Sequence, residues 1–239
     1  GFSLAPSTED YEKFFAEQLI KAQNVIHITM AKHASQGYAN AIEAAKSFEN
    51  VTVLDSGHLS SSMGLIVLYA AYMAENGATK TDIVTTVNRL GRYISSAFII
   101  DKTHMMCRAG LISKHIQVLC DALLLHPIIL LRNSKMVVSG IGMGNFTHMA
   151  KRYVRKVFVN IGSIDRRILF ITYAGLDTKS LQYIQELVRQ YCPFERVYLQ
   201  KASSAIASNC GPGSFGLLFM KKNEAVISFS EASKKEAAH

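Results

Sequence analysis

The sequence predicts an α/β protein of two domains, the first with a parallel sheet and the second with a mixed or antiparallel sheet. Over residues 1–92, short apolar strands alternate with segments of helical periodicity, which is typical of βαβ units. From residue 93, a long strand and a hairpin appear among helices, which indicates an α+β domain. A chain of 239 residues with 49% apolar residues can form two small domains around a sizeable core.

The first domain is predicted over residues 1–92. Ser7 and Thr79 each open a capping-box pattern, so a helix is expected after each of them. Helices are expected at about 8–21, 36–48, 61–75 and 79–92, and strands at 24–30 and 51–54. Ligands of parallel sheets bind beyond the carboxyl ends of the strands, so the loops at 31–37 and 55–62 are the ones where a site is expected.

The second domain is predicted over residues 93–230, followed by a polar tail at 231–239. Residues 132–135 read as the turn of a hairpin. Strands are expected at about 93–101, 127–131, 136–139, 168–173, 196–199, 215–220 and 225–229. Helices are expected near 105 and at about 112–125, 145–160 and 178–191.

The net charge indicates which binding partners to expect, and the cysteines indicate the cellular compartment. The formal net charge is +8, and basic proteins attract nucleic acid, anionic membranes or acidic partners. The one basic cluster, within residues 151–156, has helical spacing, so a solvated helix face is favoured over a nucleic-acid site. The four cysteines are scattered without zinc-site spacing, so we expect no metal, reduced thiols and a cytoplasmic protein. The apolar run at 63–74 is too short to span a bilayer, so no integral membrane segment is expected.

A glycine motif at 211–216 fits GxGxxG literally but not in context. A dinucleotide fingerprint lies between a strand and a helix, with an acidic residue about twenty positions on. Here a strand follows the motif, and acidic residues come sooner. We therefore expect no cofactor, and interpret the motif as a tight, rigid turn.

Serines occur where both predicted ligand loops lead into helices. Ser35 precedes the second helix, where its hydroxyl could cap the helix or hold a ligand carboxylate. The run at 60–62 is interpreted as an N-cap. An alternative is a serine hydrolase that uses Ser35 or one of these serines with His33 or His58, although no spacing selects such a pair.

Five short segments resemble motifs of the DegV family, in the same order and at fitting intervals. They correspond to the family's Thr-Ser-x-Pro-Ser, Leu-Ser-Gly-Thr-Tyr, Asp-Ser with Ser-Met-Gly, Lys-Gly-Gly-Arg-Ile-Ser with Lys-Pro-Ile, and His-Thr-Gly-Pro-Gly. The matching residues are Ser3–Ser7, Ala34–Ala41, Asp55–Ser56 with Ser62–Leu65, Arg108–Ser113 with His126–Ile128, and Asn209–Gly213.

This resemblance implies a bacterial fatty-acid-binding protein, the acyl-carrying subunit of fatty acid kinase. It implies that a long-chain fatty acid lies in an apolar tunnel between the domains, with its carboxylate on serine hydroxyls. No residue of this chain is then expected to be catalytic, because a separate kinase subunit does the chemistry. The implied ligand-binding residues are Ser3, Ser35, Asn209, Cys210 and Gly211.

The sequence departs from the family pattern at the head group. Asn209 replaces a histidine, Cys210 a threonine and Leu111 an arginine, so a ligand-free structural module of a larger protein is a third hypothesis. The chain also begins at the first ligand motif of the family. It is therefore expected to be a fragment that lacks an N-terminal strand–helix region, with an exposed sheet edge that favours a homo-oligomer.

Overall fold

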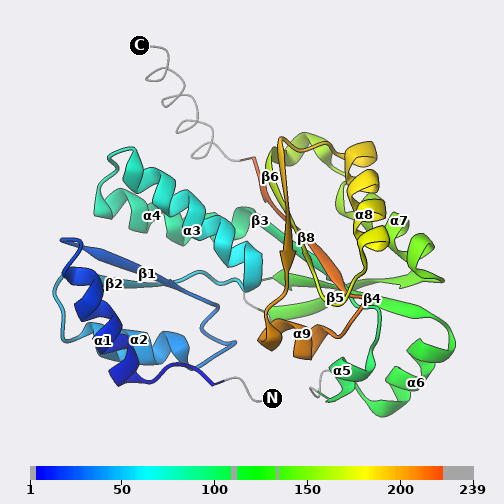
Figure 1. The fold of residues 1–239 in the computed structure, drawn as a ribbon, viewed down its shortest axis with the longest axis horizontal. Coiled ribbons are helices and arrows are strands. Elements are labelled where there is room, and N and C mark those ends of the chain that lie inside the picture. Colours follow the sequence, from blue (N-terminus) through cyan, green and yellow to red (C-terminus); the bar gives the residue numbers. More distant parts are fainter. Residues whose placement is uncertain (1–3, 109–111, 133–134, 223–239) are drawn as a thin grey trace, which may run out of the picture. The chain divides into compact units, whose positions relative to one another are not determined.

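The structure is a computed structural model that describes residues 4–108, 112–132 and 135–222 (Figure 1). These residues divide into two compact units. The N-terminal unit lies within residues 4–94, and the C-terminal unit within residues 95–132 and 136–221. The first unit holds a small parallel sheet and the second a larger mixed sheet. The predicted α/β fold class is therefore confirmed.

The N-terminal unit is built on two parallel strands. Strand β1 (Val25–Thr29) pairs with β2 (Val51–Asp55) over the full length of both. Figure 1 shows α1 and α2 on one side of these strands and α3 and α4 on the other. The helices are α1 (Thr8–Leu19), α2 (Gly37–Ala45), α3 (Ser60–Glu75) and α4 (Lys80–Leu90), and a 3-10 turn follows at Gly91–Tyr93.

Capping boxes begin two of these helices, as predicted. The Ser7 hydroxyl accepts a hydrogen bond from the Asp10 backbone N–H, and the Asp10 carboxylate accepts one from the Ser7 N–H. Thr79 and Asp82 make the same pair of bonds at the start of α4. Each box satisfies backbone donors that a helix start leaves unpaired.

An aromatic cluster packs α1 against β1. Phe15 is fully buried in the core of this unit. The ring centroid of His27 on β1 lies 5.3 Å from that of Tyr11, 6.1 Å from that of Phe14 and 5.3 Å from that of Phe15. Burial among these rings lowers the pKa of His27, because an apolar environment disfavours the charged imidazolium.

The C-terminal unit contains a six-stranded sheet in the order β5-β4-β3-β8-β6-β7, counted over the described residues. Strand β6 runs parallel to β7 and antiparallel to β8, while β3 and β4 are antiparallel. The strands are β3 (Ile94–Ile99), β4 (Leu125–Arg132), β5 (Lys135–Met143), β6 (Ile164–Tyr173), β7 (Arg196–Lys201) and β8 (Phe215–Lys221). The helices are α5 (His104–Arg108), α6 (Lys114–Ala122), α7 (Phe146–Val157), α8 (Thr178–Tyr191) and α9 (Ser204–Cys210), with a 3-10 turn at Ile161–Ser163.

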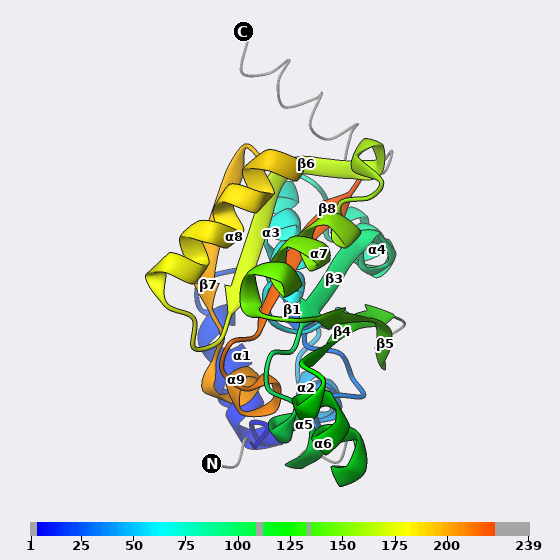
Figure 2. The same cartoon turned by 90° about the vertical axis from the view of Figure 1, so that its right-hand side faces the viewer.

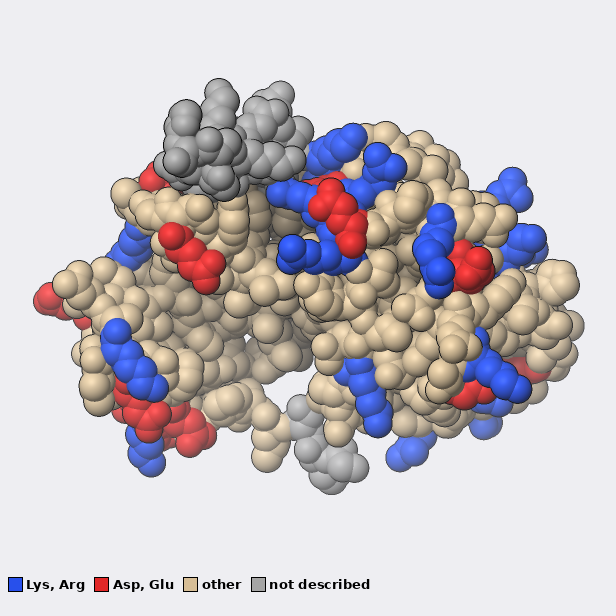
Figure 3. Space-filling view, turned by 45° about the horizontal axis from the view of Figure 1, so that its top comes forward, with Lys and Arg blue, Asp and Glu red and all other residues tan. Residues whose placement is uncertain are grey.

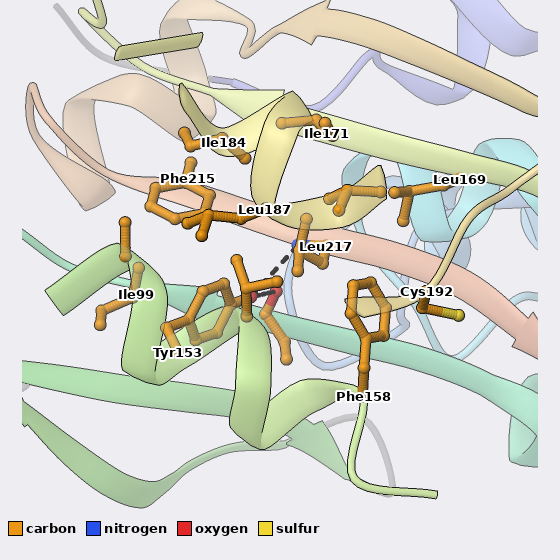
Figure 4. Packing of buried hydrophobic residues seen from close by; sticks show 14 of the residues in the cluster. Ile99, Tyr153, Phe158, Leu169, Ile171, Ile184, Leu187, Cys192, Phe215 and Leu217 are labelled. Carbon is orange, nitrogen blue, oxygen red and sulfur yellow. Dashed lines mark hydrogen bonds between the residues drawn. The ribbon is translucent and has the colours of Figure 1, made fainter. Parts of the chain in front are cut away.

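Strand β8 is apolar without interruption because it lies in the middle of the sheet. Its residues 215–220 are all buried. Figure 2 shows α7 and α8 side by side over the sheet. From α7, the fully buried Tyr153 hydroxyl donates to the Ala97 carbonyl at 2.6 Å and accepts from the Leu217 N–H at 3.2 Å (Figure 4). One hydroxyl thus joins α7 to β3 and β8.

Helix α7 also carries the basic cluster found in the sequence. Lys151, Arg152 and Arg155 are exposed, whereas Tyr153 and Val154 are buried. On the face shown in Figure 3, the positive side chains form separate groups with acidic side chains among them. The cluster is therefore the solvent-facing side of an amphipathic helix, as predicted.

Three elements differ from the prediction. Helix α9 was not predicted, although Ser203 caps it and Gly211 ends it. Strand β5 continues to Met143 through two glycines, which weaken the strand pattern. Strand β6 begins at Ile164, before the charged residues 165–167. The predicted strand at 225–229 lies outside the described residues.

We expect Tyr153→Phe to destabilise the protein by about 1–3 kcal/mol, because it leaves the Ala97 carbonyl and the Leu217 N–H buried without their shared partner. The measurement is the free energy of unfolding in urea. Tyr198→Phe is the matched control, since Tyr198 is 42% exposed. Equal stability of the two variants would contradict the role given to the Tyr153 hydroxyl.

We also expect His27 to make the protein less stable in acid. Its folded-state pKa lies below the ordinary value of 6.5, so the unfolded state binds the proton more readily. The free energy of unfolding should therefore fall as the pH drops below about 6.5. His27→Phe should reduce that fall, whereas His33→Phe at an exposed position should not. Identical pH profiles for wild type and His27→Phe would refute the expectation.

Candidate functional site

The loops that follow β1 and β2 lie together at one edge of the small sheet. Because the strands are parallel, both end there, at Thr29 and Asp55. The Ala31 N–H donates to the His58 carbonyl at 2.8 Å, and the Ser56 N–H donates to the Thr29 carbonyl at 3.1 Å. The two loops predicted to hold a site are thus bonded to each other.

Ser35 lies directly before α2 with a half-buried side chain. Its hydroxyl accepts a hydrogen bond from the Gly37 N–H at 3.0 Å, and the N-cap residue Gln36 makes no side-chain cap bond. Among the described residues, no acceptor takes the proton of the Ser35 hydroxyl. The start of α2 therefore offers one hydroxyl donor beside backbone N–H groups, which favour an anion.

Gly37 allows three segments to converge on the start of α2. A Cβ atom added at Gly37 would lie 3.1 Å from the Tyr11 hydroxyl, 3.3 Å from the Ser35 hydroxyl and 4.0 Å from the Ala5 Cβ. No signal in the sequence places the Tyr11 hydroxyl here.

The segment that follows Ser3 also lies beside the start of α2. The Asn40 side-chain amide donates to the Pro6 carbonyl at 2.7 Å, which ties residue 6 to the first turns of α2. Ser3 itself lies outside the described residues. That Ser3 and Ser35 act together stays a prediction, supported by the position of residues 5–6.

The serine run at 60–62 forms the first turn of α3 and does not cap it, so the predicted N-cap is wrong. Helix α3 begins at Ser60, its N-cap is Leu59, and no side-chain cap bond is present there. Ser60 adopts a left-handed backbone with φ 53°, and the Ser62 hydroxyl donates to the Leu59 carbonyl. The run is therefore a strained strand-to-helix turn.

The histidines of this edge do not form a serine–histidine pair. His58 is buried, and its Nε2 bonds to the Gly91 carbonyl at 2.8 Å. Its Nδ1 has no hydrogen-bond partner, and burial lowers its pKa. His33 lies exposed in the loop after β1. A general base must lie within hydrogen-bond reach of its nucleophile. The His58 ring bonds to none of the candidate serines, so it does not serve them as a base.

The C-terminal unit holds the other three predicted site residues at the end of α9. Asn209 is exposed, and its side-chain amide donates to the Ala205 carbonyl at 2.9 Å. Cys210 is partly buried against Ile100, Met106 and Ile129. Burial raises the pKa of its thiol to about 11, so the thiol is neutral at physiological pH.

Gly211 ends α9 and opens a rigid turn, as the glycine motif predicted. Its φ is 76°, and φ at Gly213 is 83°, a region that favours glycine. A Cβ atom at Gly213 would lie 2.4 Å from the Asp101 carboxylate. The Ser214 hydroxyl donates to the Cys210 carbonyl at 2.8 Å and accepts from the Asp101 N–H at 3.3 Å. The turn is thus fixed against the end of β3.

The part of the chain that the structure describes contains no cluster of side chains suited to hold a metal ion. In the same residues, no helix is both long and apolar enough to cross a membrane.

Comparison with known proteins places this architecture in a family. The family model described as "Uncharacterised protein, DegV family" matches residues 2–222. A DegV domain-containing protein of Caldanaerobacter subterraneus is 26% identical over 219 residues, which cover 90% of this chain and 77% of the relative. One from Staphylococcus aureus is 21% identical over 222 residues, 91% of this chain and 77% of the relative.

Solved structures of the same family share the fold. A fatty-acid-binding DegV family protein from Thermus thermophilus has a TM-score of 0.74 and 24% identity, covering 92% of this chain and 78% of that one. The fatty acid kinase B3 protein of Streptococcus pneumoniae, solved with linoleic acid, has a TM-score of 0.77 and 15% identity, with the same two coverages. From its family match and its fold, this chain belongs to the DegV family.

Proposed function

We propose that this chain binds one long-chain fatty acid and holds its carboxylate at the start of α2, where Ser35 donates its hydroxyl proton. The observation that carries this proposal is the Ser35 hydroxyl, which accepts from the Gly37 N–H and keeps its own proton free for a ligand. Residues 5–6 lie beside the same helix start, which supports Ser3 as a second hydroxyl. The fatty acids bound by the Thermus and Streptococcus proteins support the choice of ligand.

The carboxylate can be held at this place without an ion pair. An ionised oxygen forms shorter and stronger hydrogen bonds than a neutral one. The helix dipole adds a favourable field of up to about 1 kcal/mol at an exposed N-terminus. A buried acyl chain contributes about 0.8 kcal/mol per methylene, so most of the affinity comes from the tail and the orientation from the head group.

Several apolar side chains of the N-terminal unit are exposed. Met30 follows β1 in the loop that leads to Ser35, and Ile42 lies on α2. Val67 and Leu68 are half-exposed on α3. Such side chains gain free energy when an acyl chain covers them. The tunnel between the domains that the resemblance implies stays a prediction.

Asn209, Cys210 and Gly211 of the C-terminal unit stay predicted ligand-binding residues, and they offer only neutral groups. The Asn209 amide is exposed, and the Cys210 thiol is uncharged because burial raises its pKa. The fixed turn at Gly211 holds both side chains in place. A thiol is a weaker donor than the threonine hydroxyl of the family motif.

We infer a carrier rather than a catalyst. The His58 ring bonds to the Gly91 carbonyl and to none of the candidate serines, and burial lowers its pKa. Phosphorylation of the bound acid would then fall to a separate kinase subunit, which the likeness to the Streptococcus fatty acid kinase protein supports. No observation favours the hydrolase hypothesis over this one.

Ser35→Ala should weaken palmitate binding about tenfold or more, since it removes a hydrogen bond to a charged oxygen. Native mass spectrometry and a displacement titration with a fluorescent fatty acid measure the loss. Ser47→Ala is the matched control, because Ser47 lies beyond the other end of α2 and its hydroxyl donates to the Glu12 carboxylate.

Two experimental outcomes would contradict different parts of this proposal. Wild-type protein that binds neither palmitate nor oleate rejects the proposed function. Wild-type binding that Ser35→Ala leaves unchanged rejects only the role of Ser35.

Cys210 should resist alkylation in the folded protein. With a pKa of about 11, its thiolate is scarce at about pH 8. Iodoacetamide should therefore modify it far more slowly than in guanidinium, where all four cysteines are exposed. Peptide mass spectrometry quantifies each site. Rapid labelling of Cys210 in the folded state would contradict a buried, neutral thiol.

A further inference from the structure

Strand β5 forms one edge of the six-stranded sheet in the C-terminal unit. It comes last in the strand order, so among the described residues it has β4 on one side and no strand on the other (Figure 2). An edge strand leaves backbone N–H and C=O groups unpaired, and these groups can bond to a strand of another chain. Natural proteins often keep such strands short, whereas β5 has nine residues.

The side chains of β5 are apolar and exposed. The exposed fractions range from 39% to 60% for Met136, Val137, Val138, Ile141 and Met143. The Gly144 N–H, directly after the strand, donates to the Leu124 carbonyl at 3.0 Å, and the Leu123 and Leu124 side chains are also more than half exposed. We call these seven apolar residues the β5 patch. Monomers rarely leave a large contiguous apolar patch in water, so this edge has the character of an interface.

Helix α7 covers only one face of β5. A Cβ atom added at Gly142 would lie 3.3 Å from Met149 of α7, and one added at Gly140 would meet the Lys156 side chain. Side chains alternate between the two faces of a strand, so Ile141 and Met143 point to the face opposite α7. Because both are more than half exposed, no described segment covers that face of β5 at these positions.

The charges of the two sheet edges favour a second copy of this chain at β5. Residues 136–143 contain no ionisable side chain, so two such strands can approach each other without repulsion between like charges. At the opposite edge, β7 begins with Arg196 and ends with Lys201, and both are exposed. In a protein of net charge +8, such cations oppose the pairing of two copies. A neutral strand also offers no electrostatic attraction to a charged partner.

We propose that β5 pairs in antiparallel fashion with β5 of a second copy, so that two six-stranded sheets become one and the β5 patch is covered. A two-fold axis brings the same strand of both copies together in opposite directions, and antiparallel strands exchange backbone hydrogen bonds. The proposal is independent of fatty-acid binding. It concerns a different edge from the one predicted in the small parallel sheet, whose role in a homo-oligomer stays a prediction.

Lys156 makes this pairing depend on salt. Its Nζ donates to the carbonyl of Ser139, the middle residue of β5, at 2.8 Å. A pairing centred on the strand brings the two Lys156 side chains towards each other, and a lysine at an edge opposes strand pairing. Salt screens repulsion between exposed charges. The association of two copies should therefore become tighter as the salt concentration rises.

Analytical ultracentrifugation of the full chain tests the pairing. Interfaces of ordinary size give dissociation constants of about micromolar or below, so wild type should be mainly dimeric at about 100 μM. Ile141→Lys should weaken the association at least about tenfold, because it places two like charges in an apolar contact. Leu199→Lys on β7 is the matched control, since Leu199 is exposed on the other edge of the same sheet, and it should leave the association unchanged. Wild type that stays monomeric, or a dimer that Ile141→Lys leaves intact, overturns the proposal.

Hydrogen exchange of the wild-type protein, measured by mass spectrometry, distinguishes a second copy from other occupants of the edge. Between about 1 and 100 μM protein, the N–H groups of residues 136–143 should become protected, while those of residues 196–201 should not change. Protection that is already constant at the lowest concentration shows that the chain covers its own edge, and it overturns the proposal. An association that weakens with salt does the same. This measurement decides the proposal even if Ile141→Lys fails to fold.

Discussion

The parallel pairing of β1 with β2 is the constraint on which the candidate site depends. Because both strands end at the same edge, α2 and α3 both begin there, and the two loops before them bond to each other. Neither helix start has a side-chain cap of the usual N-cap kind. Uncapped N–H groups beside the Ser35 hydroxyl create a place for an anion. This edge is therefore the place where we propose that a carboxylate binds.

In the C-terminal unit, the turn at residues 211–214 is held rigidly. Gly211 and Gly213 take backbone conformations that side chains disfavour, and Asp101 occupies the space that glycine leaves. The Ser214 hydroxyl joins both sides of the turn. Behind it, His126 bonds the end of β3 to Gly144. A rigid turn keeps neutral groups such as the Cys210 thiol in place.

Much of this could be predicted from the sequence, and the failures have physical reasons. Capping boxes and apolar periodicity located α1, α4, β1 and β2, because these signals are local. Helix α9 was missed because seven residues give too little periodicity. The place of the Tyr11 hydroxyl beside Gly37 was not predicted, since it depends on the packing of distant segments. The serine run at 60–62 was interpreted as a cap because propensity cannot reveal the left-handed Ser60.

The central claim is that a fatty-acid carboxylate lies against the first turn of α2, and amide NMR during an oleate titration tests it most directly. The account predicts that the Gly37 and Tyr38 N–H signals shift strongly downfield at saturation, as expected for donors to a carboxylate, while signals at the far end of α2 change little. Saturable oleate binding that leaves the signals of residues 35–38 unmoved would contradict it.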